Sequence, residues 1–266
     1  SIDYPIVNFS ILRHRSFAVG MFTSFVLGFG LYGSVFVFPV FCQNLLGFSA
    51  QQTGELLFPG GVCTIVMMPF IGKMLNKGIP AQFMATAGMF LFFVFTTMLS
   101  NSTLGTGEKD VLIPLLIRGV GMALLFVPLT TLAIADLKNS ELGQGTGLNN
   151  MMRQLGGSFG IAVLTTIIHL RSAVHRSNLL SNINPYNNAF NDRLHMIEQA
   201  FLAKGKSAID ALHMAYAAIE GAVARQSLLL TYDDAYYISG LVMLVSIPLL
   251  YLQPFKKNVK VPTDVH

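Results

Sequence analysis

The sequence predicts an all-α integral membrane protein with six transmembrane helices, and two observations support this prediction. First, 53% of the 266 residues are hydrophobic and only 11% are charged, whereas about 25% of the residues in an ordinary soluble domain are charged. Second, the chain contains six apolar stretches, each about 18 residues or longer, which is the length that a helix needs to cross a hydrocarbon layer of about 30 Å. The 24 glycines agree with this class, because glycine is frequent in membrane helices.

The first five predicted spans follow one another closely along the chain. Short polar connections separate them, so neighbouring helices are expected to run antiparallel through the membrane. The expected bounds are residues 17–41, 53–71, 82–100, 112–135 and 145–169. Together they predict a five-helix transmembrane segment over residues 17–170.

The sixth predicted span, residues 227–252, follows a much longer connection, residues 171–226, which holds most of the remaining charge. Two stretches of this connection, 193–203 and 207–224, show helical spacing of apolar residues. Charged residues interrupt both stretches, so neither is expected to cross the membrane. We therefore predict an extracytoplasmic loop with amphipathic helices, a pair of surface helices that cap the outer mouth of the bundle.

Lysine and arginine residues near the helix ends favour a cytoplasmic N-terminus. This orientation places eight basic residues at cytoplasmic helix ends and four at outer ends. An even number of spans then puts both termini in the cytoplasm, with residues 1–16 as a linker and 253–266 as a tail. The cytoplasmic set is Arg13, Arg15, Lys73, Lys77, Lys138, Lys256, Lys257 and Lys260, and the outer set is Lys109, Arg171, Arg176 and Arg225. Because the chain begins with Ser1 and shows no signal-peptide pattern, we expect a fragment or a C-terminal half of a longer protein.

Several function classes are not expected from the motifs of the chain. The two cysteines, Cys42 and Cys63, lie in no metal-binding or disulfide pattern, and we expect neither a metal nor a cofactor. The basic residues are scattered, so nucleic-acid binding is not expected. Residues 156–160 match the G-x-S-x-G nucleophile motif, but they lie within a predicted span rather than at a strand-to-helix turn. The chain is therefore not expected to be an enzyme.

Two arginines lie inside predicted spans, where an ionisable side chain is costly and marks a functional site by default. Arg118 is about two turns from the outer end of the fourth span, and Arg153 is about two turns from the inner end of the fifth. Arg118 either lines a substrate path or extends to the lipid headgroups. Arg153 shares a helix face with Asn149 and Gly156, and it either serves transport or fixes helix packing through hydrogen bonds.

Three carboxylates near predicted helix ends are candidates for proton coupling, because a proton-driven transporter needs a group that changes charge. Glu55 lies near the outer end of the second span, and Asp233 and Asp234 open the sixth. All three also suit the first turns of a helix, where a carboxylate complements the helix dipole. Both interpretations stay open.

Small residues recur at intervals of four in two of the predicted spans. Gly156 and Gly160 form a GxxxG pattern in the fifth span, and Gly20, Ser24 and Gly28 form a similar series in the first. Small side chains at this spacing let helix backbones approach closely. These faces are therefore predicted to pack against other helices.

Five strings stand in a distinctive order along the chain. They are FAVGMFTSFVLGFG from residue 17, LLFPGG at 56–61, RGVGMALLFVPL from residue 118, GQGTGLNNMMRQLGGSFG from residue 143, and NPYN at 184–187. Their order resembles the C-terminal half of drug:proton antiporters of the major facilitator superfamily, most closely the EmrB/QacA type with fourteen spans. The resemblance covers the chain from about residue 10 to residue 255.

The resemblance implies one major facilitator half-bundle of six helices that pairs with a homologous N-terminal half. Substrate would bind between the halves near the bilayer midplane, and rocking of the halves would give alternating access. The string GKMLNKG at 72–78 resembles the superfamily's cytoplasmic loop motif, although Asn76 stands where an acidic residue is often found. The candidates for the substrate cavity or its gates, carried over position by position, are Ser24, Tyr32, Arg118, Asn149, Asn150 and Arg153.

The resemblance further implies the export of hydrophobic or amphipathic drugs by proton antiport. The implied partners are the missing half, hydrophobic small molecules, protons, the lipid bilayer, and a periplasmic adaptor with an outer-membrane channel. The implied location is the bacterial inner membrane. Two alternatives stay open: a dedicated exporter of a metabolite such as a siderophore or fatty acid, and a non-transporting six-span scaffold.

Overall fold

A computed structural model describes residues 15–135, 137, 141–181 and 183–252, and within these residues every regular element is a helix. Six helices of this described part are long and apolar enough to cross a membrane, judged by length and composition. The prediction of an all-α chain with six candidate spans is therefore confirmed. In order, the helices are α1 (Arg15–Asn44), α2 (Ala50–Asn76), α3 (Ala81–Leu99), α4 (Glu108–Ile134), α5 (Leu142–Leu180), α6 (Asn188–Ala203), α7 (Ala208–Val245) and α8 (Ile247–Leu250).

Most of the predicted cytoplasmic linker, residues 1–14 of 1–16, and the whole predicted tail, residues 253–266, lie outside the described residues. The same holds for several residues used to predict the orientation: Arg13, Lys138, Lys256, Lys257 and Lys260. The cytoplasmic location of the two termini therefore stays a prediction.

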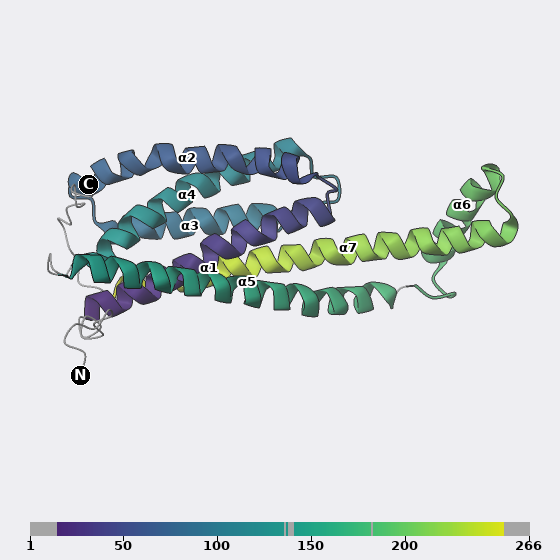
Figure 1. The fold of residues 1–266 in the computed structure, drawn as a ribbon. Coiled ribbons are helices and arrows are strands. Elements are labelled where there is room, and N and C mark those ends of the chain that lie inside the picture. Colours follow the sequence, from purple (N-terminus) through teal and green to yellow (C-terminus); the bar gives the residue numbers. More distant parts are fainter. Residues whose placement is uncertain (1–14, 136, 138–140, 182, 253–266) are drawn as a thin grey trace.

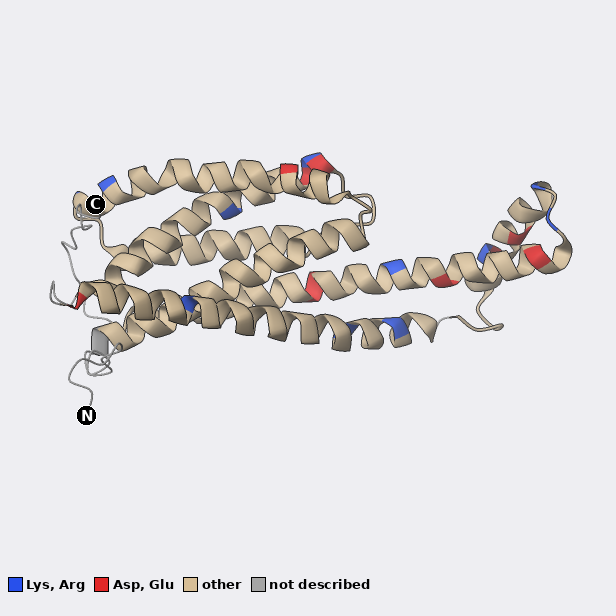
Figure 2. Ribbon diagram, in the orientation of Figure 1, with Lys and Arg blue, Asp and Glu red and all other residues tan. Residues whose placement is uncertain are grey.

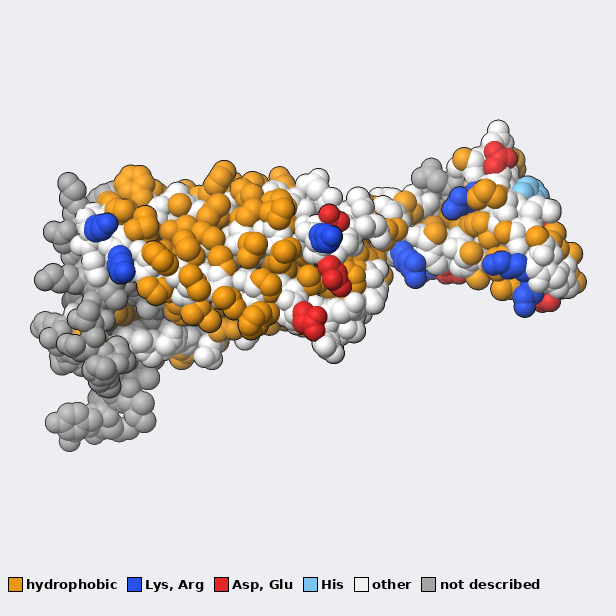
Figure 3. All heavy atoms as spheres, turned by 90° about the horizontal axis from the view of Figure 1, so that it is seen from above, with side chains coloured by type: hydrophobic (Ala, Val, Ile, Leu, Met, Phe, Trp, Pro, Cys, Tyr) orange, Lys and Arg blue, Asp and Glu red, His pale blue; other side chains and the backbone are white. Residues whose placement is uncertain are grey.

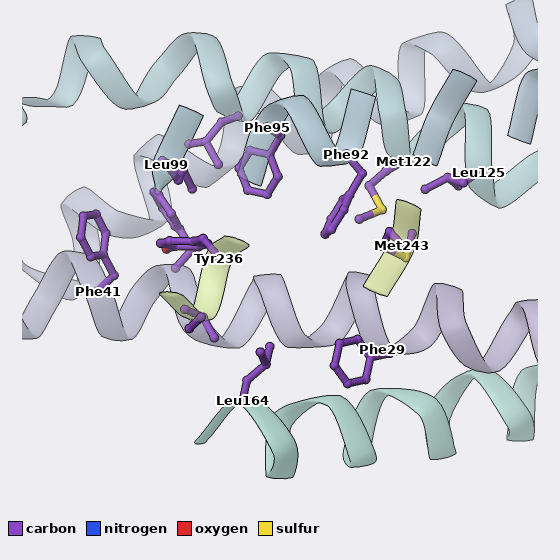
Figure 4. Packing of buried hydrophobic residues seen from close by; sticks show 14 of the residues in the cluster. Phe29, Phe41, Phe92, Phe95, Leu99, Met122, Leu125, Leu164, Tyr236 and Met243 are labelled. Carbon is purple, nitrogen blue, oxygen red and sulfur yellow. The ribbon is translucent and has the colours of Figure 1, made fainter. Parts of the chain in front are cut away.

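Five long helices and one end of α7 form a bundle (Figure 1). Within it α1 packs along α5, α4 packs against both α2 and α3, and α7 packs against α3 and α5. Helix α1 lies mostly inside the bundle, whereas α2 and α5 leave most of their apolar surface uncovered. The aromatic side chains of the core come from different helices, and Phe41 on α1 contacts the rings of Tyr232 and Tyr236 on α7 with centroids 5.5 and 5.8 Å apart. Figure 4 shows this core.

The surface of the bundle has the charge distribution of a membrane protein. Lys and Arg side chains lie at one end, acidic and basic side chains lie at the other, and hydrophobic side chains cover the surface between them (Figure 3). Charged side chains are also frequent beyond the bundle, along the outer parts of α5 and α7 (Figure 2). The apolar band is the part of the molecule that suits a hydrocarbon layer.

The helices begin and end at positions that the sequence explains. Ser49 caps α2: its hydroxyl accepts a hydrogen bond from the Gln52 backbone N–H at 3.1 Å, and the Gln52 side chain accepts one from the Ser49 N–H at 2.9 Å. This reciprocal pair satisfies two backbone donors at the start of a helix. Gly47 lies in the turn before it with a φ of +73°, a conformation that glycine adopts without strain.

The predicted close packing of small residues occurs between α1 and α5. A Cβ atom added to Gly28 would overlap the backbone carbonyl of Arg153, and one added to Gly156 would overlap the carbonyl of Phe25. A Cβ atom on Gly160 would come within 2.8 Å of the Phe29 carbonyl oxygen. The two backbones therefore approach more closely than larger side chains would allow.

The predicted surface helices differ from the observed structure. Helix α7 runs without a break from Ala208 to Val245, so the expected separate helix at 207–224 and the expected span beginning at 227 are one element. Charged residues in this stretch lower its hydropathy, but the stretch contains no proline, and charged residues such as glutamate and arginine are good helix formers. Helix α5 likewise continues to Leu180 instead of ending at 169.

The outer parts of α5 and α7 form a hairpin that projects from the bundle, with α6 packed on α7 at its tip (Figure 1). We call this unit, from about residue 171 to residue 226, the projecting hairpin. It extends away from the end of the bundle and does not cap its mouth as expected. Polar contacts join its two helices, α5 and α7. Arg176 of α5 donates to Glu220 of α7 at 2.8 Å, and the Ser227 hydroxyl of α7 donates to the Ser172 carbonyl of α5 at 3.0 Å.

Candidate functional site

A pocket of about 320 Å³ lies between α1, α2 and α4. Leu31 and Val35 line it from α1, and Arg118 and Met122 line it from α4. Helix α2 contributes one face, made of Leu57, Gly60, Gly61, Thr64 and Ile65. The lining is apolar except for Arg118 and Thr64, which is the composition of a site for small hydrophobic or amphipathic molecules.

The close crossing of α2 and α4 explains why Arg118 reaches this pocket. A Cβ atom on Gly119 would overlap the Gly60 carbonyl, and one on Gly60 would lie 2.8 Å from the Leu115 carbonyl oxygen. At the crossing the Thr64 hydroxyl lies 3.0 Å from the carbonyl oxygens of both Gly60 and Gly119. Arg118 is next to this crossing and is therefore held at the pocket wall.

The Arg118 side chain is directed into the bundle. Its guanidinium carbon lies 5.8 Å from the ring centroid of Phe95 on α3, a distance at which the ring face attracts a cation. Its Nε is buried and has no hydrogen-bond partner among the described residues. No acidic side chain of the described part forms a salt bridge with it. The pocket wall therefore contains a cation that forms no salt bridge within the described part of the chain.

Arg153 lies elsewhere and has protein partners. Its side chain is only 5% exposed, its Nη2 donates to the Thr130 hydroxyl at 3.2 Å, and its guanidinium carbon lies 4.4 Å from the Phe126 ring centroid. These contacts join α5 to α4. The structure thus does not bring Arg118 and Arg153 together, and the contacts of Arg153 suit the packing interpretation.

The other cavity candidates occupy two kinds of position. Tyr32 is 38% exposed, packs on Gly157, and lines a second, shallower pocket of about 240 Å³ with Gln154 and Ser158. Asn150 is exposed. Ser24 and Asn149 are fully buried, and their side chains form no hydrogen bonds within the described part of the chain.

The three carboxylate candidates also occupy different kinds of position in their helices. Glu55 is exposed near the start of α2 and accepts a hydrogen bond from Gln51 at 2.9 Å, which suits a residue at a helix start. The expectation that Asp233 and Asp234 occupy the first turns of a helix is wrong, because α7 begins at Ala208. The charged residues between 208 and 226 lower the hydropathy there, so the predicted helix starts too late. Asp233 and Asp234 therefore lie well inside α7 and not at its start.

The two neighbouring aspartates have different surroundings. Asp234 forms salt bridges with Arg171 at 3.2 Å and with His175 at 2.8 Å, both on α5, at the base of the projecting hairpin. Asp233 is partly exposed, but its Oδ1 is buried and has no hydrogen-bond partner among the residues described. Asp234 therefore joins two helices, whereas Asp233 faces the bundle with an unsatisfied carboxylate oxygen.

Sequence reasoning did not select Tyr236, which is 1% exposed and whose hydroxyl has no hydrogen-bond partner within the described residues. A signal was available, since Tyr236 follows Asp233 by three residues and thus shares its helix face. Met122 and Thr64 of the pocket were also missed, because nothing in a single span distinguishes a cavity-facing side chain from a lipid-facing one.

Comparisons with known proteins give a consistent result. The sequence profile described as Major Facilitator Superfamily matches residues 2–161. The chain is 27% identical over 251 residues to the fatty acid resistance protein FarB of Neisseria gonorrhoeae, covering 94% of this chain and 47% of FarB. It is 30% identical over 200 residues to the multidrug export protein EmrB of Haemophilus influenzae (74% and 39% covered) and 26% identical over 255 residues to EmrB of Escherichia coli (94% and 47%). The chain spans about half the length of the first of these relatives.

Proposed function

Because the chain belongs to the major facilitator superfamily, we propose that it forms one six-helix half of a membrane exporter for hydrophobic or amphipathic compounds, driven by proton antiport with alternating access. The observation that carries this proposal is the apolar pocket between α1, α2 and α4 with Arg118 in its wall. An apolar lining binds a range of hydrophobic molecules because it discriminates weakly between them. The names of the EmrB relatives support the same class of substrate.

The partner of this half is proposed to be a homologous half-bundle that covers α2 and α5. These two helices expose large apolar side chains, among them Phe58 at 71%, Ile65 and Phe159. A contiguous apolar surface of this kind suits another protein surface or lipid. Residues 17–170 and 227–252 would then lie in a bacterial inner membrane, residues 171–226 on its outer side, and both termini in the cytoplasm.

A second candidate function is the export of amphipathic anions such as long-chain fatty acids. It is favoured by Arg118, because a cation in a low-dielectric site is costly without a counter-charge, and no described residue forms a salt bridge with Arg118. The carboxylate of a fatty acid would supply that counter-charge while its chain occupied the apolar lining. FarB, a relative over most of this chain, is named for fatty acid resistance.

The test uses the full-length protein in inverted membrane vesicles with a pH-sensitive dye. After energisation, ethidium or palmitate is added, and the proposed antiport predicts proton release that Arg118→Ala removes or reduces for at least one probe. Arg176→Ala, on the projecting hairpin and paired with Glu220, is the matched control and should respond like the wild type. A folded wild-type protein that responds to neither probe would contradict the proposal and favour a non-transporting scaffold.

We further propose that the projecting hairpin contacts a periplasmic adaptor that leads to an outer-membrane channel. The hairpin is the part of the chain that extends farthest from the bundle (Figure 1), and it exposes apolar side chains such as Ile209 at 72%, Tyr186 and Tyr216. A photoreactive amino acid at position 216 should cross-link to the adaptor in whole cells. The same amino acid at exposed position 74 on α2 should not, and equal cross-linking at both positions would contradict the assignment.

A further inference from the structure

Three buried polar atoms without hydrogen-bond partners come from residues on α4 and α7. They are Nε of Arg118, the hydroxyl oxygen of Tyr236 and Oδ1 of Asp233, and none has a partner within the described chain. Buried polar groups are nearly always hydrogen-bonded, so each exception requires an explanation. Three exceptions on residues that interact with one another point to a shared function.

Tyr236 connects the other two residues. It interacts electrostatically with Asp233 on its own helix and with Arg118 on α4. Its ring lies between Phe41 of α1 and the α3 residues Phe95 and Leu99 (Figure 4), and the Arg118 guanidinium lies beside the same Phe95 ring. Asp233 lies one turn nearer to the projecting hairpin than Tyr236, and Arg118 lines the pocket. The three side chains thus lead from the hairpin end of the bundle to the pocket.

The chemistry of these groups suits proton binding. A carboxylate within a membrane bundle is costly and is usually functional, and a phenol can donate one hydrogen bond while it accepts another. A tyrosine that interacts with both groups can therefore donate to the Asp233 carboxylate and accept from the Arg118 guanidinium. In that arrangement the negative charge of Asp233 compensates the positive charge of Arg118 through the tyrosine.

We propose that Asp233, Tyr236 and Arg118 form a proton-binding site that controls the charge of the pocket, an inference that rests on the proposed export function for its biological role. The Asp233 carboxylate takes one proton from water at the hairpin end and becomes a neutral carboxylic acid. It returns the same proton to water when it ionises again. Arg118 stays protonated throughout, so proton binding makes the site more positive by one charge.

This change of charge has opposite consequences for the two classes of substrate. Proton binding to Asp233 weakens the binding of a cation such as ethidium in the pocket and strengthens the binding of an anion such as palmitate. Because linkage is reciprocal, ethidium binding favours proton release, as antiport requires. The sign of the pH dependence therefore identifies the substrate class that this half can exchange for protons.

Other ionisable groups near Asp233 define the control. Asp234 is the next residue on α7 and is paired with Arg171 and His175 of α5. Two further groups interact with Tyr236: Tyr232, one turn earlier on α7, and Cys42 of α1. Asp234→Asn removes the neighbouring carboxylate and its contact with His175. A pH dependence that came from this pair would be lost in Asp234→Asn and kept in Asp233→Asn.

The experiment measures ethidium binding to the purified full-length protein across a pH series, together with infrared difference spectra of a pH jump without ethidium. We expect the wild type to show a carboxylic-acid C=O band at low pH and ethidium affinity on the order of tenfold weaker there. Asp233→Asn should lose both the band and the pH dependence, Asp233→Glu should shift the band, and Tyr236→Phe should reduce the pH dependence with little change of shape. Asp234→Asn should keep both signals.

Two results would overturn the proposal: a carboxylic-acid band that persists in Asp233→Asn, or a wild-type pH dependence of ethidium binding in that variant. A failure of the export function looks different. If the wild type shows the Asp233 band but moves no protons in response to ethidium or palmitate, the proton-binding site stands and the proposed transport does not.

Discussion

The contact between α1 and α5 allows a quantitative prediction for Gly156→Ala. The added Cβ atom would overlap the Phe25 carbonyl oxygen and would lie 2.7 Å from the carbonyl carbon and 2.9 Å from Cα of Phe25. Carbon atoms in favourable contact are about 3.5–4.0 Å apart, so the helices must separate by roughly 1 Å. Overpacking of this kind costs about 1–3 kcal/mol. Alanine also stabilises a helix by up to about 1 kcal/mol relative to glycine, which opposes this cost.

A matched control removes the effect of helix propensity. Gly221 on α7 is exposed, and an added Cβ atom there meets nothing within 4 Å, so Gly221→Ala shows only the gain from alanine. We expect Gly156→Ala to unfold at a lower temperature than Gly221→Ala by about 2–4 °C for each kcal/mol of the difference. The assay is thermal unfolding of the full-length protein in detergent. Equal midpoints for the two variants would refute the close approach of α1 and α5.

Three further predictions concern single hydrogen bonds, each measured by the shift of the thermal midpoint. Ser227→Ala should cost about 1 kcal/mol and speed hydrogen exchange in the projecting hairpin, because it removes the bond to the Ser172 carbonyl; unchanged exchange would contradict this role. Thr130→Val should cost about 1.5–3 kcal/mol, since it removes the bond from the buried Arg153, and a neutral effect would show that Phe126 alone supports the cation. Ser49→Ala should cost about 1 kcal/mol through the loss of the α2 cap, whereas Ser49→Thr should keep most of the stability that the cap provides.

Much of the fold could be predicted from the sequence, because lipid imposes a simple rule on composition and length. All six spans predicted from the sequence overlap observed helices. The spacing of Gly156 and Gly160 predicts a packing face, and α1 packs against this face in the structure. Hydropathy does not measure helix length, and this is why the predicted bounds of α5 and α7 are wrong. Charged residues end an apolar run but do not end a helix, so hydropathy predicts a helix start at residue 227, whereas α7 begins at Ala208.

The candidate site could be predicted only in part, because its geometry depends on contacts between helices. Arg118 and Arg153 look alike in the sequence, yet Arg118 lines the pocket, whereas Arg153 donates a hydrogen bond to Thr130 and lies beside Phe126. Asp233 and Asp234 are adjacent but face different neighbours. A single sequence shows which residues share a helix face, but it does not show which neighbouring helix that face meets.

The uninterrupted course of α7 gives the projecting hairpin the mechanical properties of a lever arm. The stretch from residue 208 to residue 226 is about 28 Å long at 1.5 Å per residue, and it continues into the bundle without a joint. A tilt of this half by about 10° would therefore displace the tip by about 5 Å. A spectroscopic label near α6 would report angular motion of the bundle as a change in distance, and a protein bound at the tip would experience the same amplified displacement.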